Sequence, residues 1–160
     1  MTQRGKLHFF CGKMAAGKST LARQIAHRED AILLVQDELL GTLFPGEIVD
    51  IPGYVARARR LNEALTGHVC SLLARGIPVV LDFPGNTRTQ RAWFRTILDT
   101  AGAEHELHFV DVADDVCKRQ LRERSARLAA GSAFTTDEEF DAITRRFEPP
   151  ADDEGFTVIR

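Results

Sequence analysis

Cysteine is rare in this sequence, and the few cysteines present form no binding pattern. The chain has three of them, an odd number with no C-x-x-C spacing: Cys11, Cys70 and Cys117. Neither a disulfide framework nor a zinc site is therefore expected, and a reducing cytoplasmic location fits. The histidines also lack a metal-binding spacing, and His105 and His108 would point to opposite faces of a strand. We assign the histidines no role from the sequence.

Long apolar runs and an excess of one charge are also missing. No run approaches the length that a membrane-spanning helix requires, about 18 apolar residues, and the N-terminus lacks the apolar region of a signal peptide. The net charge is −2 and the isoelectric point is near 6.2, so no global charge attracts nucleic acid or an anionic membrane. With 160 residues, the chain is predicted to form one domain, residues 1–160, around a single core.

The sequence does contain a phosphate-binding pattern. Residues 12–19, GKMAAGKS, fit the spacing G-x-x-x-x-G-K-[ST]. In such a loop, Gly12 and Gly17 let the backbone curl so that successive N–H groups face the α- and β-phosphates. Lys18 then reaches the β- and γ-phosphates, and the Ser19 hydroxyl can bind Mg²⁺. The residues predicted here to bind the nucleotide are Gly12, Lys13, Met14, Ala15, Ala16, Gly17, Lys18, Ser19 and Thr20.

Short apolar strands alternate with helical patterns along the chain. Strands are expected over residues 7–10, 31–36, 77–82, 105–112 and 156–159, and helices after the phosphate loop and over about 53–74, 87–101, 114–130 and 135–147. Thr87 precedes Gln90, and Thr135 precedes Glu138, by the three residues of a capping box. Residues 38–52 are expected to be irregular, with at most one helical turn. This alternation predicts an α/β fold with a parallel sheet and helices on both faces.

Two aspartates follow expected strands. Ligands of a parallel α/β sheet lie beyond the carboxyl ends of its strands, which is where Asp37 and Asp82 occur. Asp37 is the candidate to receive or orient an acceptor hydroxyl, and Asp82 is the candidate to hold Mg²⁺ together with Ser19. Either aspartate could instead cap a helix or form a turn. The two roles could also be exchanged or shared, and the sequence does not separate them.

Four further residues are candidates for the wall of an acceptor pocket. Tyr54 and Arg57 lie in the segment expected to form that wall, with packing in the core or exposure on the surface as the alternative. Arg88 and Arg91 lie in the first turn of a helix, where a cation opposes the helix dipole. Contact with an anionic ligand would explain these two cations, and so would simple exposure to solvent.

A basic helix after the fourth strand predicts a lid. Residues 118–127 carry five positive charges and one negative charge, with only a narrow apolar stripe. A lid over residues of about 117–134 would place Arg124 and Arg127 on the β- and γ-phosphates, since guanidinium groups bind phosphate bidentately. The alternative is a solvated helix whose cations pair with acids three or four residues away.

With these residues in place, the chain resembles the small P-loop kinases of the gluconate kinase, chloramphenicol phosphotransferase, zeta toxin and polynucleotide kinase type, which are often labelled AAA-family ATPases. The similarity covers nearly the whole chain and rests on residues 12–20, Asp37, residues 79–82 with Asn86 and Arg91, the lid arginines, and residues 147–150. It implies a three-layer P-loop NTPase fold with five parallel strands in the order 2-3-1-4-5 and a short helical lid. It also implies ATP, Mg²⁺ and transfer of the γ-phosphoryl group to a hydroxyl that Asp37 faces.

The sequence leaves two classes of function open. We favour an ATP- and Mg²⁺-dependent kinase for a hydroxyl group of a small metabolite or antibiotic, with Lys18, Asp37, Arg124 and Arg127 as catalytic residues. The alternative is a nucleotide-binding switch or a partner-dependent NTPase. Polynucleotide or nucleoside phosphorylation has less support, because no segment interleaves aromatic and basic residues. The sequence does not identify the acceptor, the preference for ATP or GTP, or whether the protein is a monomer or a homodimer.

Overall fold

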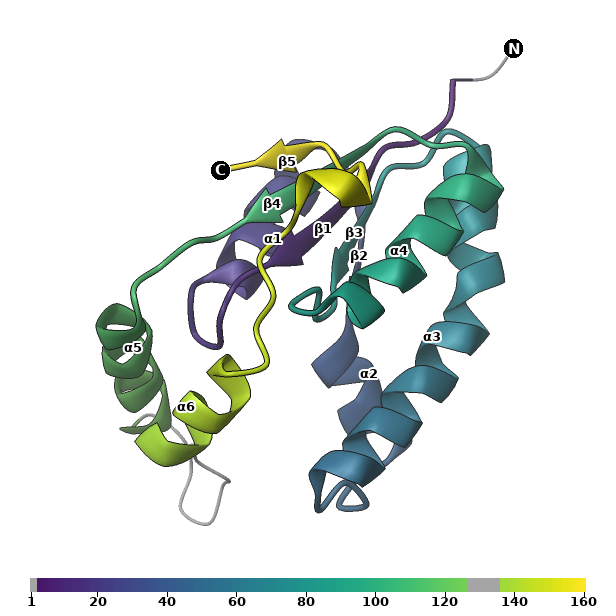
Figure 1. Cartoon of the computed structure of the whole chain (residues 1–160). Coiled ribbons are helices and arrows are strands. Elements are labelled where there is room, and N and C mark those ends of the chain that lie inside the picture. Colours follow the sequence, from purple (N-terminus) through teal and green to yellow (C-terminus); the bar gives the residue numbers. More distant parts are fainter. Residues whose placement is uncertain (1–2, 127–135) are drawn as a thin grey trace.

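The computed structural model describes residues 3–126 and 136–160. Its centre is one sheet of five parallel strands in the order β2-β3-β1-β4-β5 (Figure 1). The strands are β1 (Leu7–Cys11), β2 (Ile32–Val35), β3 (Val79–Asp82), β4 (His105–Phe109) and β5 (Val158–Ile159). The expected α/β fold and the strand order 2-3-1-4-5 are confirmed. β4 ends at Phe109, before the predicted end at residue 112.

Helices cover both faces of this sheet (Figure 1). They are α1 (Lys18–Arg28), α2 (Gln36–Leu43), α3 (Ile51–Ala74), α4 (Arg88–Ala101), α5 (Asp114–Ala126) and α6 (Asp137–Thr144), with a short 3₁₀ helix, η1 (Asp152–Glu154), before β5. α1 packs on β1, β2 and β3, whereas α3 and α4 pack on each other and on the opposite face. None of the helices in the described part of the chain has both the length and the apolar surface needed to cross a membrane.

Alternate residues of the central strand face two different cores. Phe9 belongs to the larger core formed with α3 and α4, where its ring stacks on Phe94 with 4.4 Å between centroids. Phe10 faces the other way and packs with Ile25 of α1. All residues of β1 are buried, which is typical of a central strand in a parallel sheet. The strand that leads into the phosphate loop is therefore held from both sides.

Residues 36–43 form the helix α2. The sequence predicted a strand that ends at residue 36 and, over residues 38–52, irregular structure with at most one helical turn. Asp37 and Glu38 lie in the first turn of α2, where acidic side chains stabilise a helix by interacting with the positive end of its dipole. Leu40 is buried in the main core and holds the helix against the sheet. Gly41, which suggested a loop, is accommodated inside the helix, so tertiary packing outweighs the local preference.

The helix α6 begins one residue later than predicted. Thr136 caps it, whereas the sequence suggested Thr135: its Oγ1 accepts a hydrogen bond from the Glu139 N–H at 3.1 Å. Two adjacent threonines are each followed three residues later by a glutamate, so the local pattern fits two registers. The observed register buries Phe140 completely, and packing therefore selects it. The helix ends at Thr144, before the predicted end near residue 147.

Candidate functional site

The phosphate loop connects β1 to α1, and two glycines determine its shape. Gly17 caps α1 with a φ of 105°, a backbone conformation that residues with a side chain rarely adopt. A Cβ atom at Gly12 would lie only 2.8 Å from the carbonyl oxygen of Val110, so a larger residue would force the backbone apart. The loop therefore needs glycine at both positions: Gly17 for its backbone conformation and Gly12 for its close packing against Val110.

Asn86 supports the beginning of this loop. Its Oδ1 accepts a hydrogen bond from the Gly12 N–H at 2.9 Å, and its own N–H donates to Oε1 of Gln90 at 2.8 Å. Thr87 caps α4 as predicted, since its Oγ1 accepts from the Gln90 N–H at 3.1 Å. The residues that start α4 therefore also position a support for the phosphate loop.

Lys18 lies at the centre of the candidate site. Its ammonium group donates hydrogen bonds to the carbonyl oxygen of Gly12 and, at 3.1 Å, to that of Lys13. Burial lowers the pKa of Lys18, and the charges of Asp82 and Asp37 act against this shift. The loop lysine and the two aspartates at the strand ends therefore share one electrostatic environment.

The two aspartates lie at the same edge of the sheet. Asp82 ends β3 and is in register with Val35, the last residue of β2, and Asp37 follows in the first turn of α2. Asp37 is exposed as a residue, but the atoms around its carboxyl displace water and raise its pKa; the charge of Asp82 raises it further, and the charges of Arg124 and Lys18 lower it. The structure thus brings together four residues that the sequence singled out separately.

Tyr54 and Arg57 lie on α3, beside α2. The Tyr54 hydroxyl donates a hydrogen bond to Oε1 of the buried Gln36 at 2.6 Å. Burial and the charge of Asp37 raise the pKa of Tyr54 to about 12, so the phenol lies within electrostatic reach of that aspartate. The Arg57 guanidinium lies over the ring of Phe44, 5.5 Å from its centroid. Gln36 was not among the residues predicted from the sequence, where its only signal is a polar residue at the end of an apolar run.

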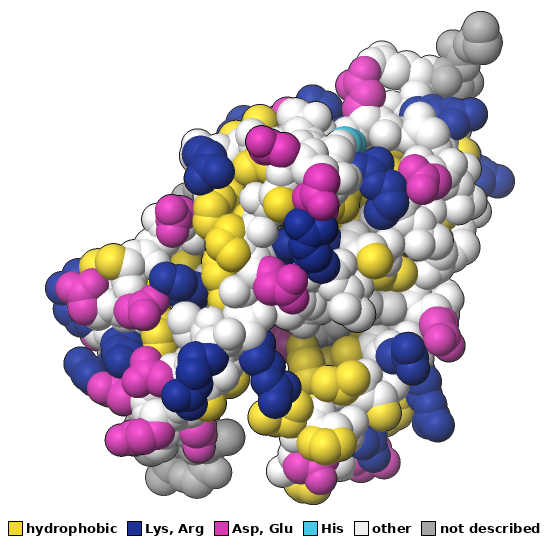
Figure 2. Space-filling view, viewed as in Figure 1, with side chains coloured by type: hydrophobic (Ala, Val, Ile, Leu, Met, Phe, Trp, Pro, Cys, Tyr) yellow, Lys and Arg dark blue, Asp and Glu magenta, His cyan; other side chains and the backbone are white. Residues whose placement is uncertain are grey.

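An apolar groove runs along the N-terminal part of α3. It has a volume of about 650 Å³ and is lined by Ile51, Pro52, Val55, Ala56, Arg59 and Arg146. Because Arg146 follows α6, the groove faces both α3 and the end of α6. Figure 2 shows the molecule hollowed between the α5–α6 pair and the α2–α3 arm, with hydrophobic side chains gathered on that arm. This surface combines apolar contact with two guanidinium groups.

The helices α5 and α6 pack on each other and on the phosphate loop. One buried cluster joins the three elements: Ala16, Cys117, Leu121 and Phe140. In addition, Nζ of Lys13 forms an ion pair with Asp114, in the first turn of α5, at 2.6 Å. Movement of α5 would therefore shift the phosphate loop directly.

The basic residues of α5 have different partners. Lys118 pairs with Asp141 at 2.9 Å and Arg122 pairs with Asp137 at 2.6 Å, so both side chains bind α6. Arg124 is exposed and forms no ion pair within residues 3–126 and 136–160, while its charge lowers the pKa of Asp37. The remaining lid residues, from Arg127 to residue 134, lie outside the described part of the chain.

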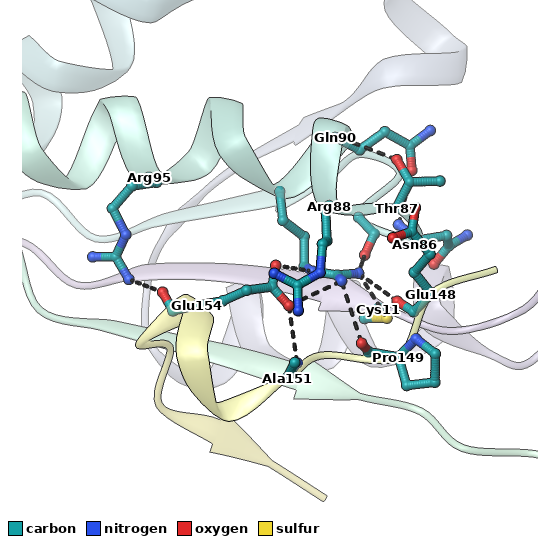
Figure 3. A network of polar contacts seen from close by, with 12 residues as sticks. Cys11, Asn86, Thr87, Arg88, Gln90, Arg95, Glu148, Pro149, Ala151 and Glu154 are labelled. Carbon is teal, nitrogen blue, oxygen red and sulfur yellow. Dashed lines mark hydrogen bonds and ion pairs between the residues drawn. The ribbon is translucent and has the colours of Figure 1, made fainter. Parts of the chain in front are cut away.

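Arg91 is not placed as an acceptor ligand. It is fully buried, and its guanidinium forms a bidentate ion pair with Glu154 at 2.8 and 3.0 Å. It also donates hydrogen bonds to the carbonyl oxygen of Gly85 at 2.9 Å and to that of Glu148 at 2.8 Å. Figure 3 shows Glu154 and Glu148 in this network. Arg91 therefore fastens the segment before β5 to the loop after β3, and it is unavailable to a substrate.

Arg88 turns toward the same segment. Its two terminal nitrogens lie 3.1 and 2.8 Å from the carboxylate oxygens of Asp153 in η1. Both side chains of this pair are exposed, so a role of Arg88 at an acceptor pocket stays a prediction. The sequence analysis missed Asp153 and Glu154, because they belong to a run of three acids in which nothing local distinguishes one from another.

Comparisons with known proteins match this architecture. A family model described as an AAA domain matches residues 7–150. A Chloroflexus aurantiacus protein named provisionally as a kinase has a TM-score of 0.76 at 18% identity, covering 99% of this chain and 85% of that chain. The gluconokinase of Sinorhizobium meliloti has a TM-score of 0.61 at 16% identity, covering 99% of this chain and 83% of that chain.

A third similar structure is the Mycobacterium tuberculosis APS kinase CysC in complex with AMPPNP and APS. Its TM-score is 0.57 at 22% identity, with coverage of 89% of this chain and 96% of that chain. A search of curated proteins finds no match. At identities this low, the likeness to the solved structures concerns the fold.

Proposed function

The chain belongs to the AAA-domain family and has the fold of the small P-loop kinases, and from this premise we propose that it is an ATP-dependent phosphotransferase. The γ-phosphoryl group of ATP would pass to a hydroxyl group of a small molecule. One observation carries the proposal: the charges of Asp82, Arg124 and Lys18 all act on the carboxyl of Asp37, which follows the end of β2. Phosphoryl transfer needs this combination of cations and carboxylates around the reacting groups.

The residues present suit a nucleotide with Mg²⁺. Ala15 and Gly17 have φ values of 60° and 105°, a conformation that turns neighbouring N–H groups toward an anion. Ser19 is exposed at the start of α1, and Asp82 is partly exposed at the end of β3. A hydroxyl and a carboxylate oxygen are ligands that Mg²⁺ prefers, so these two residues would hold it. When bound, Mg²⁺ neutralises charge on the phosphate oxygens.

Each of the remaining groups has one task in the proposed reaction. Lys18 contacts the β- and γ-phosphates, and Arg124 stabilises the charge that develops on the transferred group. Asp37 orients the acceptor hydroxyl and takes its proton. Tyr54 and Arg57 line the acceptor site on the side of α3.

Incubation with [γ-³²P]ATP, Mg²⁺ and a panel of hydroxylated acceptors tests the proposal. We expect labelled product with at least one acceptor, and ADP release that depends on that acceptor. A nucleotide-binding switch or a partner-dependent NTPase would instead hydrolyse ATP slowly, at a rate that no acceptor raises and that Asp37→Asn leaves unchanged. That second pattern would refute the kinase proposal.

Asp37→Asn is expected to lower kcat by about a hundredfold while leaving the Kd for ATP nearly unchanged, because the amide cannot accept the proton of the acceptor hydroxyl. Steady-state kinetics and calorimetric titration with ATP would measure the two effects. Since burial and Asp82 raise the pKa of Asp37 above 3.8, kcat/KM should also fall as the pH is lowered through that raised value. The variant should lack this fall in kcat/KM at low pH, which we call the acidic limb.

Glu38→Gln is the matched control for Asp37→Asn. Glu38 is the exposed neighbour of Asp37 in the first turn of α2. We expect this variant to keep both the turnover and the acidic limb of the wild-type protein. An equal loss of turnover in the two variants would contradict the role of Asp37.

Arg124→Ala is expected to lower kcat by about tenfold or more, with a much smaller change in the Kd for ATP, because the guanidinium acts on charge that develops during transfer. Arg119→Ala, at an exposed position on the same helix, provides the control and should change neither value. Equal losses in kcat and in ATP affinity would count against a lid that acts in the transition state. Arg127→Ala is predicted to have the same effects on kcat and on the Kd for ATP as Arg124→Ala.

A further inference from the structure

Two histidines and a glutamate meet on the sheet face where α1 packs. His8 lies on β1, and Glu106 and His108 lie on the neighbouring strand β4. In the parallel register, His8 is opposite Glu106, and Phe10, which packs on α1, is opposite His108. These histidines were assigned no role from the sequence because they show no metal-binding spacing; His8 and His108 are 100 residues apart.

Three potential ligand atoms of this cluster form a small triangle. Nδ1 of His8 lies 3.1 Å from Nε2 of His108. Oε2 of Glu106 lies 3.5 Å from Nδ1 of His8 and 3.6 Å from Nε2 of His108. Among the described residues, these side chains form a group whose ligand atoms all lie within 4.8 Å of one another.

These separations suit a shared metal ion better than a set of hydrogen bonds. The imidazole pair is within hydrogen-bond distance, but contacts of 3.5 and 3.6 Å to the carboxylate exceed the limit of about 3.2 Å for N–H···O bonds. In a tetrahedral zinc site with bonds of about 2.0–2.1 Å, ligand atoms lie about 3.3–3.4 Å apart. The three measured separations, 3.1, 3.5 and 3.6 Å, bracket that value.

Both histidines of the cluster are buried, at a cost in free energy. His8 is 1% exposed and His108 is 6% exposed. Within the described residues, Nε2 of His8 is buried without a hydrogen-bond partner, so this side chain is costly to bury.

Lys6 orients the carboxylate toward the histidines. Its ammonium group donates a hydrogen bond to Oε1 of Glu106 at 3.1 Å, so that Oε2 is the oxygen that faces the two imidazoles. A groove of about 520 Å³ lies beside the cluster and is lined in part by Arg28, Glu106 and His108. This groove offers an ion a path from solvent and room for water as a further ligand.

We propose that His8, Glu106 and His108 bind one transition-metal ion of the Zn²⁺ type, through two imidazole nitrogens and one carboxylate oxygen. Imidazole ligands favour Zn²⁺ and its neighbours Co²⁺ and Ni²⁺ over Mg²⁺. The site is separate from the phosphate loop, because His8 precedes Gly12 by four residues, about 13 Å along a strand. Since its ligands come from β1 and β4, the metal would link these strands and stabilise the fold.

Calorimetric titration of the chelator-treated protein with ZnCl₂, in buffer with excess Mg²⁺, tests the site. We expect one Zn²⁺ per chain, and a Kd that rises at least tenfold in Glu106→Gln and in His108→Gln. The exposed histidines provide matched controls, so His27→Gln and His68→Gln should bind Zn²⁺ like the wild-type protein. The same Zn²⁺ affinity in Glu106→Gln and His27→Gln would overturn the proposal, and so would the absence of binding at micromolar concentrations.

Two further measurements do not depend on the His108 variant or on the proposed kinase activity. Co²⁺ bound to the wild-type protein should show the strong visible absorption of a four-coordinate ion, and this absorption should be lost in Glu106→Gln. Zn²⁺ should raise the Tm of the wild-type protein and of His27→Gln, but not that of Glu106→Gln. Glu106 is partly exposed, so its variant is expected to fold, which circular dichroism would check. A weak, six-coordinate Co²⁺ spectrum in the wild-type protein would overturn the site.

Discussion

Lys18→Ala should reduce kcat/KM for phosphoryl transfer by a factor of about a thousand, which corresponds to about 4 kcal/mol of transition-state stabilisation. The ammonium group is partly buried in the loop, and the charges of Asp82 and Asp37 act on it. No other cation in the described part of the loop takes this place, since the side chain of Lys13 pairs with Asp114. The measurement is kcat/KM with the best acceptor of the panel.

The control for this variant is Arg23→Ala, which removes an exposed cation from α1 and should keep full activity. Circular dichroism of Lys18→Ala would verify the fold, because Lys18 also donates hydrogen bonds to carbonyl oxygens of the loop. Folded Lys18→Ala protein with wild-type turnover would disprove the assignment of residues 12–19 as the catalytic phosphate loop.

Arg91→Met is expected to lower the free energy of unfolding by about 3–5 kcal/mol, since it leaves the carboxylate of Glu154 buried without its partner. The variant also leaves the carbonyl oxygens of Gly85 and Glu148 without their shared donor. Urea denaturation, with the midpoint and the slope fitted separately, measures this loss. A double variant with Glu154→Leu should be less destabilised than Arg91→Met, because it removes both charges.

Arg88→Met is the matched control on the same helix. Its partner Asp153 is exposed, and water screens the pair, so we expect little change in stability. A loss in Arg91→Met no larger than that in Arg88→Met would contradict the structural role of Arg91.

The buried pair also predicts a pH dependence of stability. Burial acts to raise the pKa of Glu154, but the Arg91 guanidinium and the Ala151 N–H lower it overall, below 4.5. The contribution of Glu154 to stability is therefore fully present above pH 4.5 and is lost as the pH falls through the lowered pKa. Arg91→Met should weaken this part of the acid sensitivity.

Several parts of the fold follow from patterns within a few residues. The two glycines, the lysine and the serine of residues 12–19 identify the phosphate loop, because a backbone that faces phosphate requires these residue types at this spacing. Thr87 starts α4 through a hydrogen bond to a residue three positions away. The alternation of strands and helices predicted a parallel α/β sheet, and the resemblance to P-loop kinases supplied the strand order that the structure confirms.

The candidate site could be predicted in part. Asp37 and Asp82 were identified because the strands of a parallel sheet end at one edge, and the structure places both near Lys18. Their separate roles remain a prediction. The register of α6 and the helix α2 were not predictable, because each depends on whether a side chain, Phe140 or Leu40, finds space in a core.

The sequence by itself determined the elements whose causes are local: the phosphate loop, the main helix starts and the apolar strands. Only the tertiary structure decided which charged and polar side chains meet. The sequence made Arg91 a candidate for the acceptor pocket, with exposure to solvent as the alternative, but the fold pairs it with Glu154, 63 residues away. His8 had no partner in the sequence, and β4 places His108 beside it, 100 residues away. Such contacts depend on strand register and on helix packing, and the free energy that selects them belongs to the whole core.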